Sequence, residues 1–176
     1  MSTFSQCNLR SVDETVFAKA VLKLKVLKIE WSKLTREQTS ALFTEIAKKS
    51  SLEELAFVGN HVDHVQPAVI GRAVGTLTKV TLENSWMSVD VFKEIFENAK
   101  DSKTLQEMNI GGDSFGGDLS LVRPEVFGDV ISRLRSIRLK DLTLSQDQCM
   151  RAISATKQSP VYINVKMFKV NILCNI

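Results

Sequence analysis

The two histidines of the chain, His61 and His64, lie on either side of Asp63. Imidazole and carboxylate groups at such spacing are typical metal ligands. The segment supplies no third strong ligand beyond Asp63, and Gln66 follows that residue at the spacing of a helix capping box. We therefore expect Asp63 to cap a helix, and we predict no metal and no cofactor.

Three cysteines, Cys7, Cys149 and Cys174, have no CxxC spacing and form an odd set. This pattern argues against a disulfide framework and against a structural zinc site. A reducing compartment is the simplest interpretation, so we expect a cytoplasmic protein.

The segment GGDSFGGD, from Gly111 to Asp118, has glycines like those that let backbone N–H groups surround a phosphate. It has no following lysine, and its two acidic residues would repel an anion. An insertion that extends a binding surface explains it better. The chain has 23 lysine and arginine residues and 20 aspartate and glutamate residues, which gives a net charge of +3. Because the two signs are interspersed and the basic residues do not cluster, we expect no nucleic-acid ligand.

A repeated apolar pattern accounts for most of the chain. Leu-x-x-Leu-x-Leu-x-x-x-x-Leu, with other apolar residues at some positions, recurs at intervals of 25 to 29 residues. That period is typical of one supersecondary unit stacked on copies of itself. The apolar positions of the five units are Leu24, Leu27, Ile29 and Leu34; Leu52, Leu55, Phe57 and Val62; Leu77, Val80, Leu82 and Met87; Leu105, Met108, Ile110 and Phe115; and Leu134, Ile137, Leu139 and Leu144.

Each unit reads as a short strand followed by a helix. The alternation around its fourth and sixth positions predicts a half-buried strand. A helix start follows each strand: Ser88 is an N-cap candidate without a capping-box partner, and Pro124 suits the first turn of its helix. The capping-box candidates are Thr35 with Gln38, Asp63 with Gln66, and Ser145 with Gln148. The apolar i, i+4 pairs expected on the helices are Leu42 and Ile46, Ile70 and Val74, Ile95 and Ala99, and, after four extra residues, Phe127 and Ile131.

Stacking separates the residues that a nucleophilic mechanism would need. Each unit of a repeat array contacts only its neighbours, so Cys149 in the fifth unit does not meet His61 in the second. We predict that the protein is not an enzyme.

The segments LKVLKIEWSKL, LEELAFVGNHV, LTKVTLENSWM, LQEMNIGGDSF and LRSIRLKDLTL resemble leucine-rich repeats of the ribonuclease-inhibitor class. The resemblance implies an α/β fold: a right-handed solenoid, or short horseshoe, with a concave parallel sheet and convex helices. The family's ninth-position Asn or Cys is matched only by Asn60. Ser32, Ser85, Asp113 and Leu142 stand at the other four positions.

These degenerate repeats are more similar to those of nucleotide-binding immune receptors than to the regular repeats of the inhibitor. No GxxxxGK[ST] phosphate loop accompanies them. At Leu142 the family's side-chain hydrogen bond to the neighbouring loop cannot form, which puts the turn of the fifth unit in question.

We expect one leucine-rich-repeat domain over residues 1–176. Residues 1–23 would form an N-terminal cap whose helix, about residues 11–22, covers the open edge of the first strand. Residues 24–158 hold about five repeats. Residues 159–176 form a capping strand or a truncated repeat, with Val165, Phe168 and Val170 as its apolar positions. Four lysines interrupt the apolar stretch 16–29, so we expect no membrane span.

The residues between the buried positions of each strand should face solvent on the concave side. Trp31 has the character of an interface hot spot, although it could instead pack under the N-terminal segment. Trp86 could face the rim or tuck into its turn, and we favour a structural role. The predicted protein-binding residues are Lys28, Glu30, Trp31, Glu54, Lys79, Glu83, Glu107, Asn109, Arg138 and Lys140.

The sequence therefore favours a non-catalytic recognition or adaptor module that binds another protein, comparable to the sensing end of an innate-immunity receptor. Two alternatives stay open. The chain could regulate an enzyme, as an inhibitor or a GTPase activator, in which case Arg123 is the loop arginine that would act. It could also be a structural fragment of a larger receptor.

Overall fold

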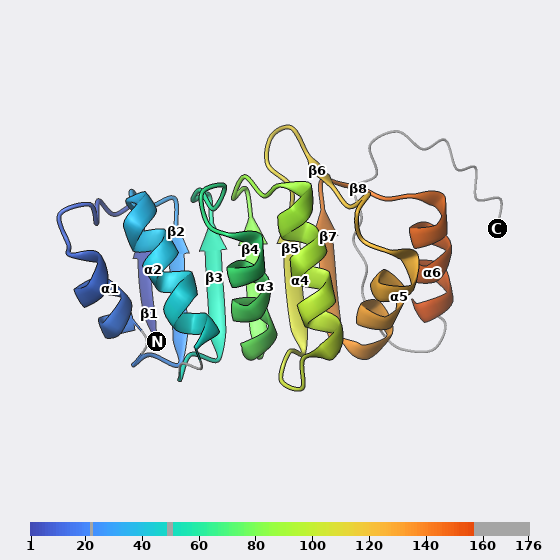
Figure 1. The fold of residues 1–176 in the computed structure, drawn as a ribbon, viewed down its shortest axis with the longest axis horizontal. Helices are drawn as coiled ribbons and strands as arrows, with labels where there is room; N and C mark the ends of the chain where they lie inside the picture. Colours follow the sequence, from blue (N-terminus) through green and yellow to red (C-terminus); the bar gives the residue numbers. More distant parts are fainter. Residues whose placement is uncertain (22, 49–50, 157–176) are drawn as a thin grey trace.

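The structure is a computed structural model that describes residues 1–21, 23–48 and 51–156. Strands and helices alternate along these residues (Figure 1). The strands are β1 (Ser2–Ser5), β2 (Val26–Glu30), β3 (Glu54–Val58), β4 (Lys79–Glu83), β5 (Glu107–Gly111), β6 (Gly117–Asp118), β7 (Ser136–Lys140) and β8 (Leu142–Thr143). The helices are α1 (Glu14–Val21), α2 (Arg36–Ala47), α3 (Pro67–Thr76), α4 (Val89–Asp101), α5 (Pro124–Arg133) and α6 (Gln146–Thr156).

Six of the strands form one parallel sheet in the order β1-β2-β3-β4-β5-β7. Parallel neighbours need a crossover connection, and a helix supplies it in each unit. The register follows the sequence pattern: Leu27 pairs with Leu55, Leu55 with Val80, Val80 with Met108, and Met108 with Ile137. Equivalent positions of successive units therefore lie side by side, as the spacing predicts.

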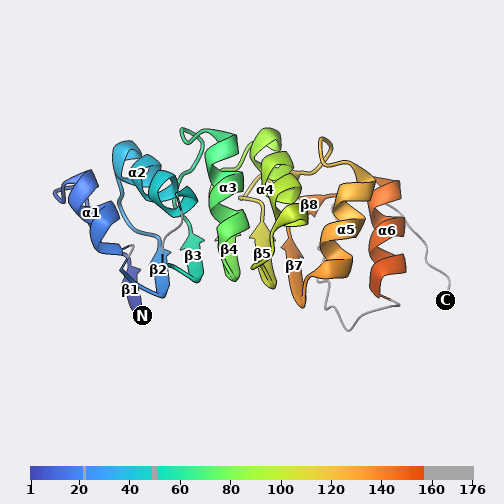
Figure 2. The same ribbon diagram turned by 60° about the horizontal axis from the view of Figure 1, so that its bottom comes forward.

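All six helices lie on one face of the sheet (Figure 2), and each packs against the next along the row. The core fills the space between helices and strands. Its largest fully buried side chains are Phe43, Phe57, Phe92, Phe96 and Phe127. Each strand from β2 to β4 alternates buried residues, which face the helices, with partly exposed ones. The i, i+4 pairs predicted for the helices are all fully buried.

Two predicted capping boxes are confirmed, and each also joins neighbouring units. The Thr35 hydroxyl accepts from the Gln38 backbone N–H at 3.1 Å, and the Gln38 side-chain oxygen accepts from the Thr35 N–H at 2.9 Å. Gln38 Nε2 then donates to the Leu9 carbonyl oxygen at 2.7 Å. Ser145 and Gln148 repeat this arrangement, and Gln148 Nε2 reaches the carbonyl oxygen of Leu119 at 2.9 Å. The glutamine thus satisfies a backbone group of the preceding unit.

The prediction that Asp63 caps a helix is wrong. Helix α3 begins at Pro67 with Gln66 as N-cap, and no side chain caps it. Proline suits the first helical turn because it has no N–H to satisfy and its φ angle is already helical. The Asp63 carboxylate lies beside the two histidines instead.

The N-terminal segment differs from the predicted cap. Strand β1 pairs with β2 in parallel register and so occupies the edge that we expected a helix to cover. Helix α1 packs against α2. Residues 1–21 therefore contribute a strand and a helix like the other units.

Small polar side chains hydrogen-bond to the backbone in the turns after β2, β3 and β4. The Asn60 amide is buried: its Oδ1 accepts from the Ser32 N–H at 3.0 Å, and its Nδ2 donates to the Ile29 and Val58 carbonyl oxygens at 3.0 and 2.8 Å. Ser85 is also buried, and its hydroxyl lies 3.1 Å from the Phe57 carbonyl oxygen. Serine thus reaches the backbone of the preceding unit in the way that asparagine does.

The glycine-rich segment begins at the end of β5, forms a loop and continues into β6. The prediction that Phe115 is an apolar core position is wrong, because its side chain is 89% exposed. Leu119, four residues later, is fully buried and takes that place. In the fifth unit, Leu142 of β8 pairs through its backbone with Gly117 of β6. This strand pairing holds the turn without a side-chain hydrogen bond from Leu142.

The predicted C-terminal strand residues Val165, Phe168 and Val170, and also Cys174, lie outside the described residues. Among the helices that are described, none has the length and apolarity needed to cross a membrane.

Candidate binding surface

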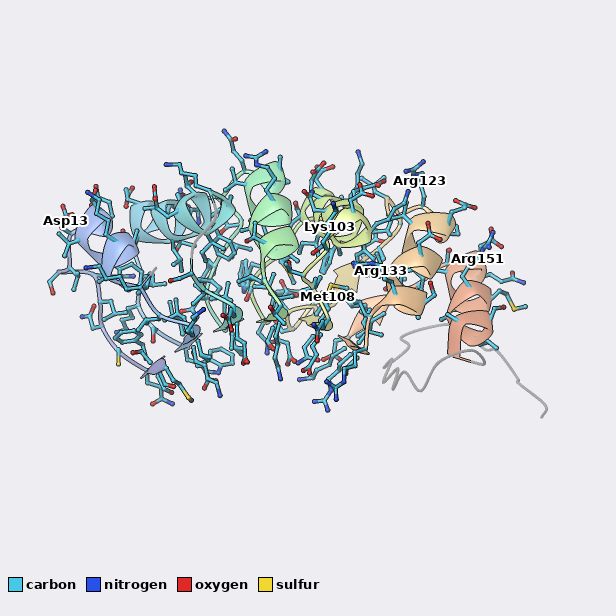
Figure 3. The ribbon with its side chains drawn as sticks, turned by 90° about the horizontal axis from the view of Figure 1, so that it is seen from below. Asp13, Lys103, Met108, Arg123, Arg133 and Arg151 are labelled. Atoms are coloured by element: carbon cyan, nitrogen blue, oxygen red, sulfur yellow. The ribbon has the colours of Figure 1, made fainter. Side chains whose placement is uncertain are left out.

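Nine of the ten predicted protein-binding residues lie on the sheet face opposite the helices. We call this surface the strand face. It consists of the outward residues of β2 to β5 and β7, which project away from the helices (Figure 3). The selected residues on it are Lys28, Glu30, Glu54, Lys79, Glu83, Glu107, Asn109, Arg138 and Lys140. The pleat of the sheet therefore gathers side chains from distant parts of the sequence.

Some of these side chains interact across strands. Lys79 Nζ lies 2.8 Å from Glu107 Oε2, and this hydrogen bond raises the pKa of Lys79. Asn109 Nδ2 donates to the Thr81 hydroxyl at 3.1 Å. Such pairs order the middle of the strand face.

Lys140 and Glu83 meet across an intervening strand. Their Nζ and Oε2 atoms are 3.8 Å apart, although β5 separates β7 from β4. Gly111 makes this approach possible, because a Cβ atom there would lie 3.1 Å from Glu83 Cγ. By contrast, Lys28 and Arg138 have no ion pair with any described residue. These two cations remain available to a partner.

The strand face is hollowed over β2, β3 and β4. A cavity of about 250 Å³ has small or apolar side chains in its lining, among them Val26, Ala56 and Thr81. Lys28, Glu30, Glu54 and Lys79 also line it. A small apolar floor with both charge signs around it can fix the orientation of a bound chain.

Trp31 lies on the rim, by which we mean the loops after β2, β3 and β4, residues 31–35, 59–66 and 84–88. It is 57% exposed, with φ 50°, and does not pack under the N-terminal segment. Its indole covers Gly59, where an added Cβ would collide with the ring. Trp86 is 48% exposed, and its ring centroid lies 4.7 Å from that of His61. The rim therefore presents aromatic side chains beside the strand face.

Asp63 and the two histidines meet at the rim. Asp63 Oδ1 lies 3.4 Å from His64 Nδ1 and 3.9 Å from His61 Nδ1. Within the described residues, no group of three or more His, Cys, Asp or Glu side chains is arranged to hold a metal ion. Neither Cys7 nor Cys149 forms a disulfide bond with a described residue, and Cys149 on α6 is far along the sheet from these histidines.

Arg123, the residue on which a GTPase-activator role would depend, lies on the helix side of the molecule (Figure 3). Its Nη2 donates to Glu97 Oε1 of α4 at 3.0 Å. The paired guanidinium lies away from the strand face, so its position does not favour that role.

A second group of polar residues, which the sequence pattern does not predict, lies in and beside the rim. Arg10, Lys33 and Arg36 line one cavity together with Trp31 and His64. They come from two units, and no periodic pattern marks them. The available signal was a basic residue on either side of the Leu34-Thr35 helix start.

No family model matches the sequence, and no curated protein matches it.

Proposed function

We propose that the chain is a leucine-rich-repeat solenoid of the ribonuclease-inhibitor type that acts as a non-catalytic protein-binding module. The repeat period, the parallel strand–helix units and the buried Asn60 amide support this assignment. Strands are spaced about 4.8 Å apart, whereas packed helices need about 8 to 10 Å. A stack of such units bends with the strand face on its concave side.

One observation carries the proposal. The strand face displays charged, polar and small side chains from five strands in register, and in the described part of the chain no element packs over it. On the opposite face of the same sheet, the helix-facing residues of β2 to β5 and β7 are buried beneath the helices (Figure 2). A surface that is shaped and ordered but not used for folding is suited to recognition.

The size of the surface sets what it can bind. Six strands give a sheet about 29 Å wide, and a standard interface uses about 20 to 30 residues on each partner. The strand face supplies fewer outward side chains than this. A partner would therefore also contact the rim, where Trp31 provides a large exposed aromatic.

Charge reversal tests the proposal. The variant Lys28→Glu/Arg138→Glu changes two unpaired cations of the strand face. Its matched control, Arg72→Glu/Lys93→Glu, makes the same charge change on exposed positions of α3 and α4. In affinity capture from lysate of cells that express the protein, the strand-face variant should lose its partners by at least about tenfold, and the control should retain them. Equal capture by both variants would contradict the proposal.

A further inference from the structure

Three basic side chains without an ion pair to any described residue lie in and next to the rim, beside an exposed aromatic side chain. A cavity of about 400 Å³ opens beside the ends of β2 and β3, next to the start of α2. We call it the rim pocket. This volume is within the range of small-ligand sites, about 300 to 1,000 Å³. The pocket is separate from the hollow on the strand face, with which it shares no lining residue.

Its charge is strongly positive. Arg10, Lys33 and Arg36 line it, and none of the three has an ion pair with a described residue. Asp63 is the one carboxylate in the lining, so the formal charge is two positive units when both histidines are neutral. Glu37 interacts electrostatically with His64 and Arg36 but does not line the pocket. A dianion would match this charge.

A buried polar atom in the lining lacks a partner. His64 contributes to the pocket, its side chain is 12% exposed, and its Nε2 is buried without a hydrogen bond among the described residues. Its Nδ1 faces Asp63 Oδ1 at 3.4 Å. An unsatisfied buried nitrogen is energetically unfavourable. The His64 ring therefore marks a polar part of the lining that no described residue satisfies.

Trp31 gives the pocket a fixed wall. Its backbone N–H donates to the Val58 carbonyl oxygen at 2.8 Å, and its indole lies over Gly59. The indole is thus already in place for a ligand, which reduces the entropic cost of binding. It offers an apolar surface to the part of a ligand that joins its charged group to a chain.

We propose that the rim pocket binds a phosphorylated side chain of the protein partner, which rests on the proposed protein-binding function. A phosphate monoester carries a charge of about −1.5 to −2 at neutral pH and three strong acceptor oxygens. Arginine is the preferred residue for charged hydrogen bonds to phosphate. A carboxylate would neutralise only half of the pocket's formal charge. In the proposed complex the phosphate interacts with the Arg10, Lys33 and Arg36 side chains, and the adjoining part of the ligand side chain lies against Trp31.

NMR titration with small probes tests the proposal without knowledge of the partner. The chain has two histidines and two tryptophans, so the His64 ring and Trp31 indole signals can be assigned by single substitution. The probes are N-acetyl amides of phosphotyrosine, phosphoserine and glutamate, together with inorganic phosphate. At least one phosphoamino acid should shift both signals until they saturate. The concentration that it needs should be about tenfold lower than the concentration needed by the glutamate derivative or by free phosphate.

Variants complete the test. Lys33→Ala/Arg36→Ala should weaken phosphoamino-acid binding at least about tenfold, while Arg72→Ala on α3 and the strand-face variant Lys28→Glu/Arg138→Glu should bind normally. Failure of all probes to shift the two signals would overturn the proposal. So would equal binding of glutamate derivative or free phosphate, or an unchanged affinity in the double alanine variant. None of these outcomes affects the capture experiment, so the two proposals fail separately.

Discussion

At the scale of single residues, the rim combines unusual backbone angles with close packing. Gly59 has φ +65°, and Trp31, Asn84 and Trp86 also have positive φ angles near 50°. Non-glycine residues adopt such angles only at a cost of about 1 to 3 kcal/mol. The position of both tryptophans therefore depends on the surrounding hydrogen bonds of the turns.

Gly59→Ala should destabilise the protein by about 1 to 3 kcal/mol, because the new Cβ requires a strained φ and collides with the Trp31 ring. Trp31 should also move, which tryptophan fluorescence would report. The matched control is Gly75→Ala in α3, where the nearest neighbouring atom would lie 3.5 Å away. Alanine there should be neutral or stabilising by up to about 1 kcal/mol. Urea unfolding measures both variants, and equal stabilities would contradict this packing.

Asn60→Ala should cost about 2 to 4 kcal/mol, because it leaves the Ser32 N–H without its buried acceptor and removes the hydrogen bonds to the Ile29 and Val58 carbonyl oxygens. Asn60→Ser should cost less, since serine performs a similar role at Ser85. Chemical denaturation of both variants tests this order. A loss below about 0.5 kcal/mol for the alanine variant would show that the amide does not hold the turn.

At the scale of elements, cross-strand pairs contribute little energy but order the strand face. The Lys79 and Glu107 side chains are 41% and 34% exposed, so solvent screens their attraction and the pair contributes less than about 1 kcal/mol. The Thr35–Gln38 and Ser145–Gln148 boxes connect each helix both to its own start and to the preceding unit.

The Lys79–Glu107 pair predicts a specific dependence of stability on pH. The pKa of Lys79 is raised in the folded protein by its hydrogen bond to Glu107. The pair's contribution is therefore fully present below the unfolded pKa of lysine, about 10.4, and is lost as the pH rises through the folded pKa. The difference in unfolding free energy between the wild type and Lys79→Met should shrink as the pH rises above about 10.4. A difference that stays constant or grows would contradict this sign.

Element types and register follow from the sequence, because the buried positions repeat with the period of strands and helices. The two wrong predictions have local physical causes. Helix α3 begins at Pro67 and not directly after Asp63, so Asp63 does not cap it. The four-residue insertion makes Leu119, and not Phe115, the buried residue of the fourth unit. The strand face could be predicted from alternation. The rim pocket could not, because Arg10 and Lys33 meet only through the turns of two units.

At the scale of the whole molecule, the described units contact mainly their neighbours along one row (Figure 1). Stability in such a stack is shared through the interfaces between units, and the ends have fewer interfaces than the middle. The molecule is therefore expected to be least stable at its terminal units.

Amide hydrogen exchange should reveal this gradient. Val80 and Leu82 in β4 should exchange most slowly, and Phe4 in β1 should exchange faster by at least about tenfold. NMR-detected exchange gives each rate directly. Equal protection of β1 and β4 would mean that the sheet opens as a single unit.

The proposed function requires the strand face to contact the partner protein. To test this contact, the photo-crosslinking residue p-benzoylphenylalanine replaces Thr81 in the middle of that face. In the control it replaces Lys93, on the exposed side of α4. We expect irradiation to crosslink a partner protein to the residue at position 81 and not to the residue at position 93. Adducts formed only from Lys93, or equally from both positions, would contradict it.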